Sequence, residues 1–197
     1  MLNRQEPMTL ETKRLTLRQW TTPDIAAFNT MSANPDVMRY FPATLTQEQS
    51  TRLAISLQCD IAKQGWGLWA VALRETGEFI GFTGLRHQTG DIPLSPFIEI
   101  AWRLDQRFWH QGYASEAAKA ALSFAFRELD APAVLAFTTR TNAPSIALMK
   151  RIGMRKLNQD FKHPLLDRNH PLADHVLYII EREEWQPSGD IQPSPSG

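Results

Sequence analysis

A glycine followed by small residues stands where the sequence predicts that a helix begins. The segment Trp109-His-Gln-Gly-Tyr-Ala-Ser-Glu-Ala117 leads from a strand-like stretch into an alanine-rich helix. Backbone N–H groups at a helix N-terminus attract anions, and the helix dipole adds to that attraction. A residue without Cβ also lets the backbone come close to a phosphate. The segment therefore suits a phosphate-binding turn. Taken alone, however, it fits better the alternative, a plain junction between a loop and a helix at which glycine eases the turn.

A second polar pair lies thirty residues further along, directly after another strand-like stretch. Asn142 and Ser145 occupy the first turn of a short predicted helix that ends at Gly153. Asn142 is a good N-cap residue, and that role alone would explain it. Ser145 has an equally simple alternative as a solvent-facing residue of the first turn.

One carboxylate stands inside an apolar strand-like run. Glu99 lies in the predicted strand 96–104, where partial desolvation favours the protonated form of a carboxyl group and suits a general base. The alternative is an ion pair with Arg86 or Arg103 that only ties the sheet together. Three other carboxylates are weaker candidates for the same role: Asp160, Asp167 and Glu78.

The segment 161–175 is rich in histidine and aspartate. A metal site can be imagined from its side chains His163, Asp167, His170, Asp174 and His175. Their spacing matches no compact ligand pattern, and two prolines interrupt any helix there. We therefore expect no metal.

Periodicity predicts the elements that must position these groups. Helices are predicted at 22–33, 46–64, 112–129 and 142–153, and strands at 14–20, 66–74, 78–86, 96–104, 133–139, 154–158 and 175–185. This order indicates a mixed α/β fold of the α+β type, with helices on both faces of the sheet. We expect a flexible N-terminus (1–8), one domain (9–185) and a disordered tail rich in Pro and Ser (186–197).

Composition narrows the class of protein. The 197 residues are 43% hydrophobic and carry 21 Lys and Arg against 21 Asp and Glu. That balance excludes disorder of the whole chain and argues against a nucleic-acid or membrane-surface partner. The N-terminal residues are polar and contain no apolar stretch, so we expect no signal peptide, and no apolar run is long enough to span a membrane. The single cysteine, Cys59, is expected to be a small core or boundary residue. We expect a cytoplasmic protein.

Five segments together resemble the GNAT superfamily of N-acetyltransferases, in the branch of the ribosomal-protein N-terminal acetyltransferases (RimJ/RimL-like). The resemblance covers Leu10 to Trp185. It implies a GNAT fold, whose central, mostly antiparallel sheet of six to seven strands splays between the fourth and fifth strands. The segments, in this order, are Glu11-Thr-Lys-Arg-Leu-Thr-Leu-Arg18, Gly81-Phe-Thr-Gly84, Glu99-Ile-Ala-Trp102, Trp109 to Ala117 and Asn142 to Met154.

The resemblance implies an acetyl-CoA site. The pantetheine arm would bond to the backbone near Trp102 and Leu104, and Asn142 would hold the cofactor arm or a water. Trp109 departs from the Arg or Gln of the family motif, and His110 stands where many relatives have glycine, so the backbone there is less free. The amides that would face the pyrophosphate are those of Gln111, Gly112, Tyr113, Ala114 and Ser115.

The activity implied is direct acetyl transfer from the thioester to a primary amine in a ternary complex. The family's proton-donating Tyr aligns with Met149, which cannot donate, and Ser145 of the Asn-x-x-Ser pattern is expected to serve instead, with Glu99 as the base. The loops 34–42 and 161–175 would line the acceptor mouth. The departure at Met149 slightly favours the alternative of an acyl-CoA-binding regulatory module without turnover, whereas Ser145 and Glu99 favour the enzyme. The sequence does not decide whether the acceptor is a protein N-terminus, a polyamine or an amino sugar. It also leaves open whether the protein is a monomer or a homodimer.

Overall fold

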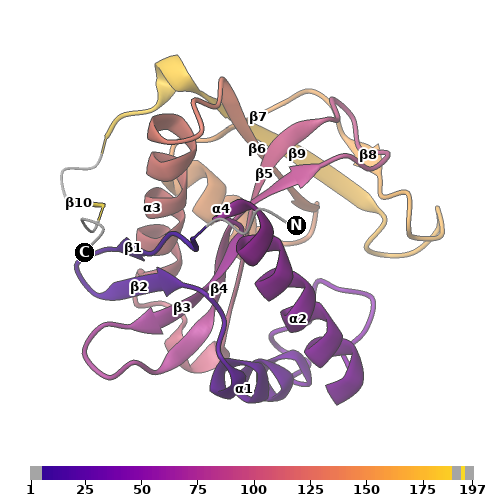
Figure 1. The fold of residues 1–197 in the computed structure, drawn as a ribbon. Coiled ribbons are helices and arrows are strands. Elements are labelled where there is room, and N and C mark those ends of the chain that lie inside the picture. The colour runs from indigo at the N-terminus through magenta and orange to yellow at the C-terminus, as the bar shows by residue number, and fades with distance from the viewer. Residues whose placement is uncertain (1–5, 188–191, 194–197) are drawn as a thin grey trace.

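The computed structural model describes residues 6–187 and 192–193, and the ten strands of this part of the chain form one mixed sheet (Figure 1). The strands are β1 (Leu10–Glu11), β2 (Leu15–Arg18), β3 (Leu68–Leu73), β4 (Phe79–Gln88), β5 (Phe97–Leu104), β6 (Ala133–Thr139), β7 (Arg155–Lys156), β8 (Phe161–Lys162), β9 (Asp174–Glu181) and β10 (Gln192–Pro193). Their order is β10-β1-β2-β3-β4-β5-β6-β9-β7, with β8 paired to β9. Neighbouring strands are antiparallel except β5 and β6, which run parallel.

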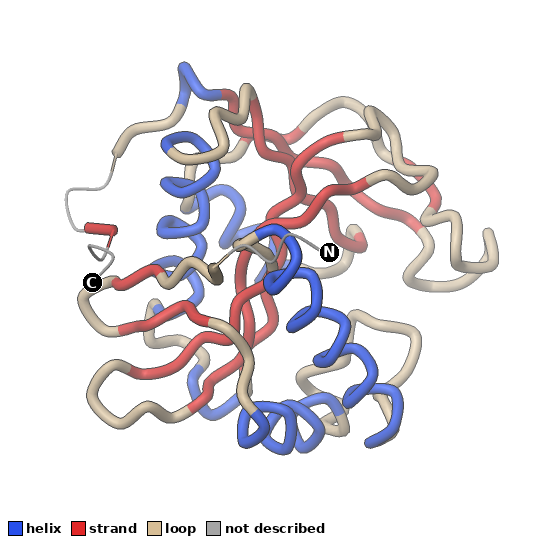
Figure 2. Tube along the Cα trace, in the orientation of Figure 1, coloured by secondary structure: helices blue, strands red, loops and turns tan. Residues whose placement is uncertain are grey.

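Four α-helices within the described residues cover both faces of the sheet (Figure 2). They are α1 (Thr22–Ser32), α2 (Gln47–Gln64), α3 (Tyr113–Arg127) and α4 (Ala143–Arg151). Phe28 of α1 packs on Phe82 of β4, whereas Phe124 of α3 packs on Trp69, which lies opposite Thr83. Consecutive residues of a strand point to opposite faces, so α1 and α3 lie on opposite sides of the sheet. The predicted fold class is confirmed.

Local capping explains where two of the helices begin. Thr46 and Gln49 form a capping box at α2, with the Gln49 N–H donating to Thr46 Oγ1 at 3.2 Å and the Thr46 N–H donating to Gln49 Oε1 at 2.9 Å. At α4, Asn142 Oδ1 accepts from the Ser145 N–H at 3.2 Å. Helix α2 ends at Gly65, whose φ of 84° is the left-handed conformation that glycine adopts most readily.

The alanines of α3 lie against the sheet. Ala117, Ala118, Ala120, Ala121 and Ala125 are completely buried. Because an alanine side chain ends at Cβ, the helix can lie close to the strands beneath it. This packing fixes the start of α3 beyond the C-terminal end of β5.

Strands β5 and β6 separate toward their C-terminal ends. Within the described chain their only register pair joins Glu99 to Leu135. By contrast, β5 pairs with β4 over eight residues and β6 pairs with β9 over seven. The gap between β5 and β6 is the predicted splay between the fourth and fifth long strands.

Three features differ from the sequence-based expectations or lie beyond them. The structure has ten strands among its described residues rather than six or seven, because β1, β7, β8 and β10 are two residues long and too short to show a periodicity. Cys59 is exposed on α2 instead of lying in the core or at its boundary. Much of the predicted flexible N-terminus and tail lies outside the described residues, although the Met8 N–H donates to the Gly65 carbonyl at 2.7 Å.

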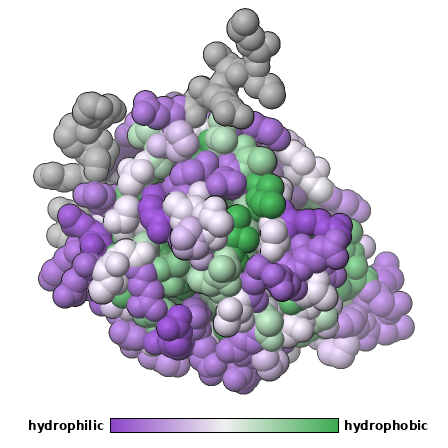
Figure 3. Space-filling view, turned by 60° about the horizontal axis from the view of Figure 1, so that its bottom comes forward, coloured by the Kyte–Doolittle hydropathy of each residue, from purple (hydrophilic) through white to green (hydrophobic). Residues whose placement is uncertain are grey.

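The surface on the side of α1 mixes hydrophilic and apolar side chains (Figure 3). Phe41, in the loop that joins α1 to α2, is 42% exposed and is among the large apolar side chains that reach the surface. None of the helices that the structure describes is long and apolar enough to cross a membrane.

Candidate active site

Two contacts join the elements on either side of the gap between β5 and β6. Trp102 of β5 donates from Nε1 to Ser145 Oγ of α4 at 3.0 Å. Arg151 at the end of α4 donates from Nη1 to Ser115 Oγ, in the first turn of α3, at 3.2 Å. The structure therefore brings the predicted phosphate turn and the predicted Asn/Ser pair to the same part of the molecule.

The phosphate turn has the backbone geometry that anion binding requires. Gly112 is the N-cap of α3 with φ of 80°, and within the described residues no side chain caps this helix. The first N–H groups of α3 consequently have no partner inside the helix and are free to face an anion. His110 has φ of 60°, a conformation that a glycine would adopt without strain. This explains why the departure from glycine at position 110 restricts the backbone.

An ion pair with the N-terminal strands holds the turn in place. Arg14 donates from Nε to Glu116 Oε2 at 2.7 Å and from Nη1 to the Gln111 carbonyl at 2.9 Å. Its guanidinium also lies 4.4 Å from the centroid of the Tyr113 ring. Burial alone would raise the pKa of Glu116, but the hydrogen bonds from Thr12 and Arg14 outweigh burial and hold that pKa below its usual value. Arg14 belongs to the first of the five segments that resemble the family, but the sequence alone did not predict its contacts with Glu116 and Gln111.

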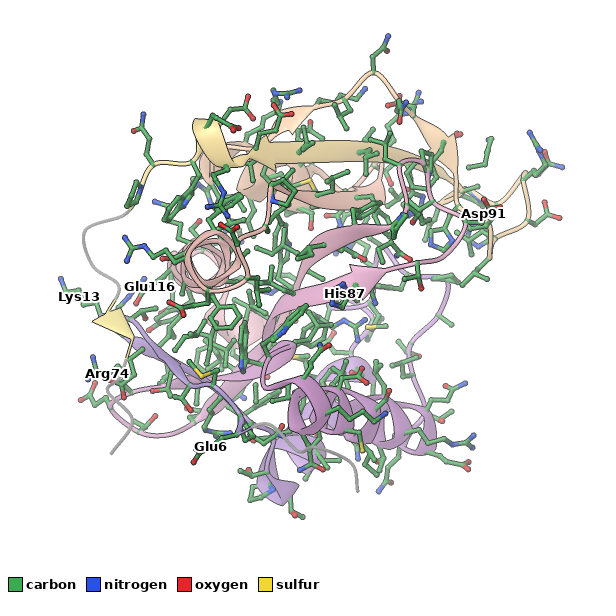
Figure 4. The ribbon with its side chains drawn as sticks, turned by 45° about the horizontal axis from the view of Figure 1, so that its top comes forward. Glu6, Lys13, Arg74, His87, Asp91 and Glu116 are labelled. Carbon is green, nitrogen blue, oxygen red and sulfur yellow. The ribbon has the colours of Figure 1, made fainter. Side chains whose placement is uncertain are left out.

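Positive charge gathers beside this turn. A surface cavity next to it is lined by Lys13, Arg14, Leu73, Arg74, Glu75 and Tyr113. Figure 4 shows Lys13, Arg74 and Glu116 on the same side of the molecule, and the cavity lining includes Tyr113, the first residue of α3. Arg151, which sequence reasoning also missed, contributes a further cation at Ser115. Arg14 is paired with Glu116, and Arg74 lies 3.6 Å from Glu11. The cations without an ion pair among the described residues, Lys13 and Arg151, add to the dipole of α3 in attracting a phosphate.

The hydroxyl of Ser145 is oriented from two sides. The backbone N–H of Ser145 donates to Asn142 Oδ1, and Asn142 in turn donates from Nδ2 to Thr138 Oγ1 at 2.9 Å. The Oγ of Ser145 accepts a hydrogen bond from the Trp102 indole N–H. Both polar ends of the Asn142 amide are thus used within the protein, as the cap interpretation predicts. Met149, on the same helix, is buried with 2% of its surface exposed.

Trp109 has a structural role at the position where the family motif has Arg or Gln. Its indole Nε1 donates to the carbonyl of Leu104, the last residue of β5, at 3.0 Å. This bond closes the turn between β5 and α3. The carbonyl of Leu104 is therefore already engaged by the chain itself.

Glu99 lies in an ion pair that also connects β4 to β5. Its two carboxylate oxygens accept from Arg86 Nε at 2.8 Å and Arg86 Nη2 at 3.0 Å, and Gln88 Nε2 donates to it at 3.2 Å. The residue is buried, with 3% of its surface exposed. Arg103, the other partner considered from sequence, makes no ion pair with any residue that the structure describes.

The weaker carboxylate candidates serve other contacts. Asp160 pairs with Arg140 at 2.9 Å and with Lys156, and Glu78 pairs with Arg107 at 3.2 Å. Asp167 accepts from the Asn169 backbone N–H at 2.8 Å, within its own loop.

The histidine-rich segment contributes a cluster of rings next to the gap. The rings of His163 and His175 lie 4.9 Å apart, and both lie 6.1 Å from Phe137 of β6. Burial lowers the pKa of each histidine, and the positive charge of Arg86 acts in the same direction on His163. Among the described residues no three His, Cys, Asp or Glu side chains are grouped so that they could hold a metal.

Comparison with known proteins gives the family. Residues 14–155 match the family described as an acetyltransferase (GNAT) domain. The uncharacterized N-acetyltransferase YnaD of Bacillus subtilis (strain 168) is 30% identical over 179 residues, which are 90% of this chain and 99% of YnaD. A crystal structure of a GNAT-family acetyltransferase from Bacillus anthracis is 28% identical with a TM-score of 0.75, over 90% of this chain and 100% of that chain.

A third similarity concerns the fold alone. The structure of Mycobacterium smegmatis RimJ in complex with CoA-disulfide has a TM-score of 0.71 at 20% identity, over 90% of this chain and 89% of that chain. The family match covers well over half of the sequence, and GNAT acetyltransferases use acetyl-CoA. The chain therefore belongs to the GNAT family and is an acetyltransferase.

Proposed function

We propose that this enzyme transfers the acetyl group of acetyl-CoA directly to a primary amine in a ternary complex. The hydrogen bond between Trp102 Nε1 and Ser145 Oγ carries the proposal. An indole N–H only donates, so Ser145 receives this bond through a lone pair and its own O–H proton stays available. A hydroxyl with a fixed orientation and an available proton suits protonation of a departing thiolate.

The cofactor is held by residues around the splay. Backbone N–H groups of residues 111–115 hold the pyrophosphate, Arg151 offsets part of its charge, and Arg14 braces the turn through the Gln111 carbonyl. The edge of β5 that has no register pair with β6 among the described residues faces the pantetheine arm at Trp102, whereas the Leu104 carbonyl is held by Trp109. Asn142 caps the start of α4 on the other side of the gap. When bound, acetyl-CoA supplies an activated acyl group.

Glu99 is proposed to accept the proton that the amine loses, directly or through a water. Arg86 holds both oxygens of the carboxylate in a bidentate pair, which fixes the orientation of the group that would take up the proton. The same pair also fits the alternative in which Glu99 only connects β4 to β5. The two roles differ in their effect on the pH profile and are separated below.

The acceptor is proposed to be a protein N-terminus or a small-molecule amine. The proposal of a protein N-terminus rests on the resemblance of the five sequence segments to the ribosomal-protein branch, and the likeness to RimJ agrees with it at the level of the fold only. The loops 34–42 and 161–175 are proposed to line the acceptor mouth, since the first carries Phe41 and the second carries the His163 and His175 rings.

Release of free CoA with and without a panel of amines and N-terminal peptides tests the proposal. Ser145→Ala should lower kcat by about ten- to a thousandfold with little change in acetyl-CoA affinity. Trp102→Phe should give a smaller loss in the same direction, because Ser145 loses its anchor but keeps its proton. Ser56→Ala, at an exposed serine of α2, is the matched control and should behave as wild type.

Two results would contradict the proposal in different ways. Full activity in Ser145→Ala would mean that water protonates the sulfur and that Ser145 only begins a helix. Acetyl-CoA binding without CoA release for any amine would instead favour the regulatory module without turnover, as the buried Met149 in place of a Tyr would suggest.

A further inference from the structure

Arg103 of β5 is a half-buried cation, and two of its three guanidinium nitrogens, Nε and Nη1, lie buried without a hydrogen-bond partner among the described residues. Burial, followed by the positive charge of Arg86, lowers the pKa of Arg103 to about 10, so the side chain stays charged near neutral pH. Buried guanidinium N–H groups without an acceptor are costly. Such a group is stable only where some other interaction compensates for it, or where a ligand does so.

Aromatic rings supply part of that compensation. The guanidinium carbon of Arg103 lies 4.4 Å from the ring centroid of Phe41, 5.3 Å from that of Phe82 and 5.8 Å from that of Phe28. A ring face attracts a cation but accepts no strong hydrogen bond. The rings therefore hold the guanidinium in place and leave its N–H groups available.

Arg103 lies on the same face of the sheet as Glu99, the proposed base for the acceptor amine. Arg103, Ala101 and Glu99 share one face of β5, and Gly84 and Arg86 lie opposite Ala101 and Glu99 on β4. Between Arg103 and the Glu99–Arg86 pair these two strands thus contribute only an alanine and a glycine, so no long side chain of β4 or β5 separates them. This is the face covered by α1 and by the loop of Phe41. The indole of Trp102 points to the opposite face, toward α4 and Ser145.

The charge balance identifies the group that would bind. Arg86 and Glu99 neutralise each other, so among the charged side chains that β4 and β5 place on this face between Phe82 and Glu99, Arg103 is the one without a counter-ion. A carboxylate carries one negative charge and matches the planar fork of a guanidinium, whereas a phosphate group would leave the site negative.

We propose that Arg103 binds a carboxylate of the acceptor, so that the enzyme prefers amines that carry a carboxylate over neutral amines. This inference rests on the proposed acetyl transfer and names its substrate class. The apolar rings around Arg103 would then contact the carbon skeleton next to that carboxylate.

Matched acceptors and matched variants test the proposal. Glycine, β-alanine, γ-aminobutyrate, methionine and phenylalanine are each compared with their carboxamides through kcat/KM from CoA release. Wild type should prefer the best carboxylate over its amide, and Arg103→Met should lose about 10- to 150-fold on the carboxylate with a small change on the amide. Arg103→Lys should retain part of the preference. Arg127→Met, which removes an exposed arginine over the ring of Trp185, is the control and should match wild type.

Thermal shifts separate this proposal from acetyl transfer itself. The preferred carboxylate should raise the melting temperature of wild type and of Arg127→Met but not that of Arg103→Met, with or without turnover. Arg103→Met alone should melt no lower than wild type, because it removes an unpaired buried charge. Equal losses on carboxylate and amide, or a marked fall in melting temperature, would make Arg103 a structural residue and overturn the proposal. If the carboxylate raises the melting temperature of wild type but no CoA is released, the proposed acetyl transfer is wrong and the proposed carboxylate site is retained.

Discussion

Substitution of Gly112 separates the geometry of the phosphate turn from its charge. Gly112 has φ of 80°, and a Cβ added to it would lie 3.4 Å from Arg14 Nη2, an ordinary contact. Asparagine and aspartate tolerate left-handed backbone better than other residues, so both Gly112→Asn and Gly112→Asp should fold and should cost about 1 kcal/mol of stability. The two variants differ only in charge, so their difference in acetyl-CoA affinity reports the electrostatics of the turn.

The size of that difference follows from Coulomb's law. At about 5 Å and an effective dielectric constant of about 40, the carboxylate and one phosphate charge repel each other by about 1.7 kcal/mol, which is about 15-fold in affinity. Arg14 lies next to the new side chain and offsets part of the repulsion. We therefore expect Gly112→Asp to bind acetyl-CoA about 5- to 15-fold more weakly than Gly112→Asn.

Calorimetric titration with acetyl-CoA at two salt concentrations measures this effect. The gap between the two variants should narrow at high salt, because added ions screen the repulsion. Melting temperatures of the free proteins check that both variants are folded. Equal acetyl-CoA affinities for the Asp and Asn variants would show that the pyrophosphate does not bind at this turn.

Two further predictions concern carboxylates. Glu99→Gln should flatten the rising limb of kcat/KM against pH and keep acetyl-CoA binding nearly intact. A lower melting temperature with that limb unchanged would mean that Glu99 acts only through its ion pair with Arg86 and not as the base. The lowered pKa of Glu116 means that its ionised form contributes stability that is present above about pH 4.5 and is lost as the pH falls through the folded-state pKa. In melting curves across pH, Glu116→Gln should therefore be less stable than wild type near neutrality and should lose less stability in acid. Parallel curves for the two proteins would refute this coupling.

The features that local sequence determines were the ones that could be predicted. The cap at Asn142, the capping box at Thr46 and the glycine that begins α3 all depend on residues within a few positions of each other. Long periodic segments likewise gave the four helices and the long strands, because their hydrophobic faces repeat several times. The splay itself followed from the family resemblance and not from periodicity.

Contacts between distant segments could not be derived from the sequence alone. Glu99 could pair with Arg86 or Arg103 on composition, and only the antiparallel register, which sets Arg86 directly opposite Glu99, decides between them. The bond from Trp102 to Ser145 likewise depends on how α4 sits across the gap. The isolation of Arg103 is a consequence of the same register, since Phe82 faces it instead of an acid.

The pair formed by Arg14 and Glu116 has a consequence for the order in which the molecule assembles. Its partners are 102 residues apart, so roughly half of the chain must be synthesised between them. Contacts of such long sequence separation form late, after the entropy of closing a large loop has been overcome. The start of α3 can become helical early, but its turn is braced only when the first strands dock beside it. Competence to bind the acyl donor is thus expected to arise near the end of folding, together with the completed sheet.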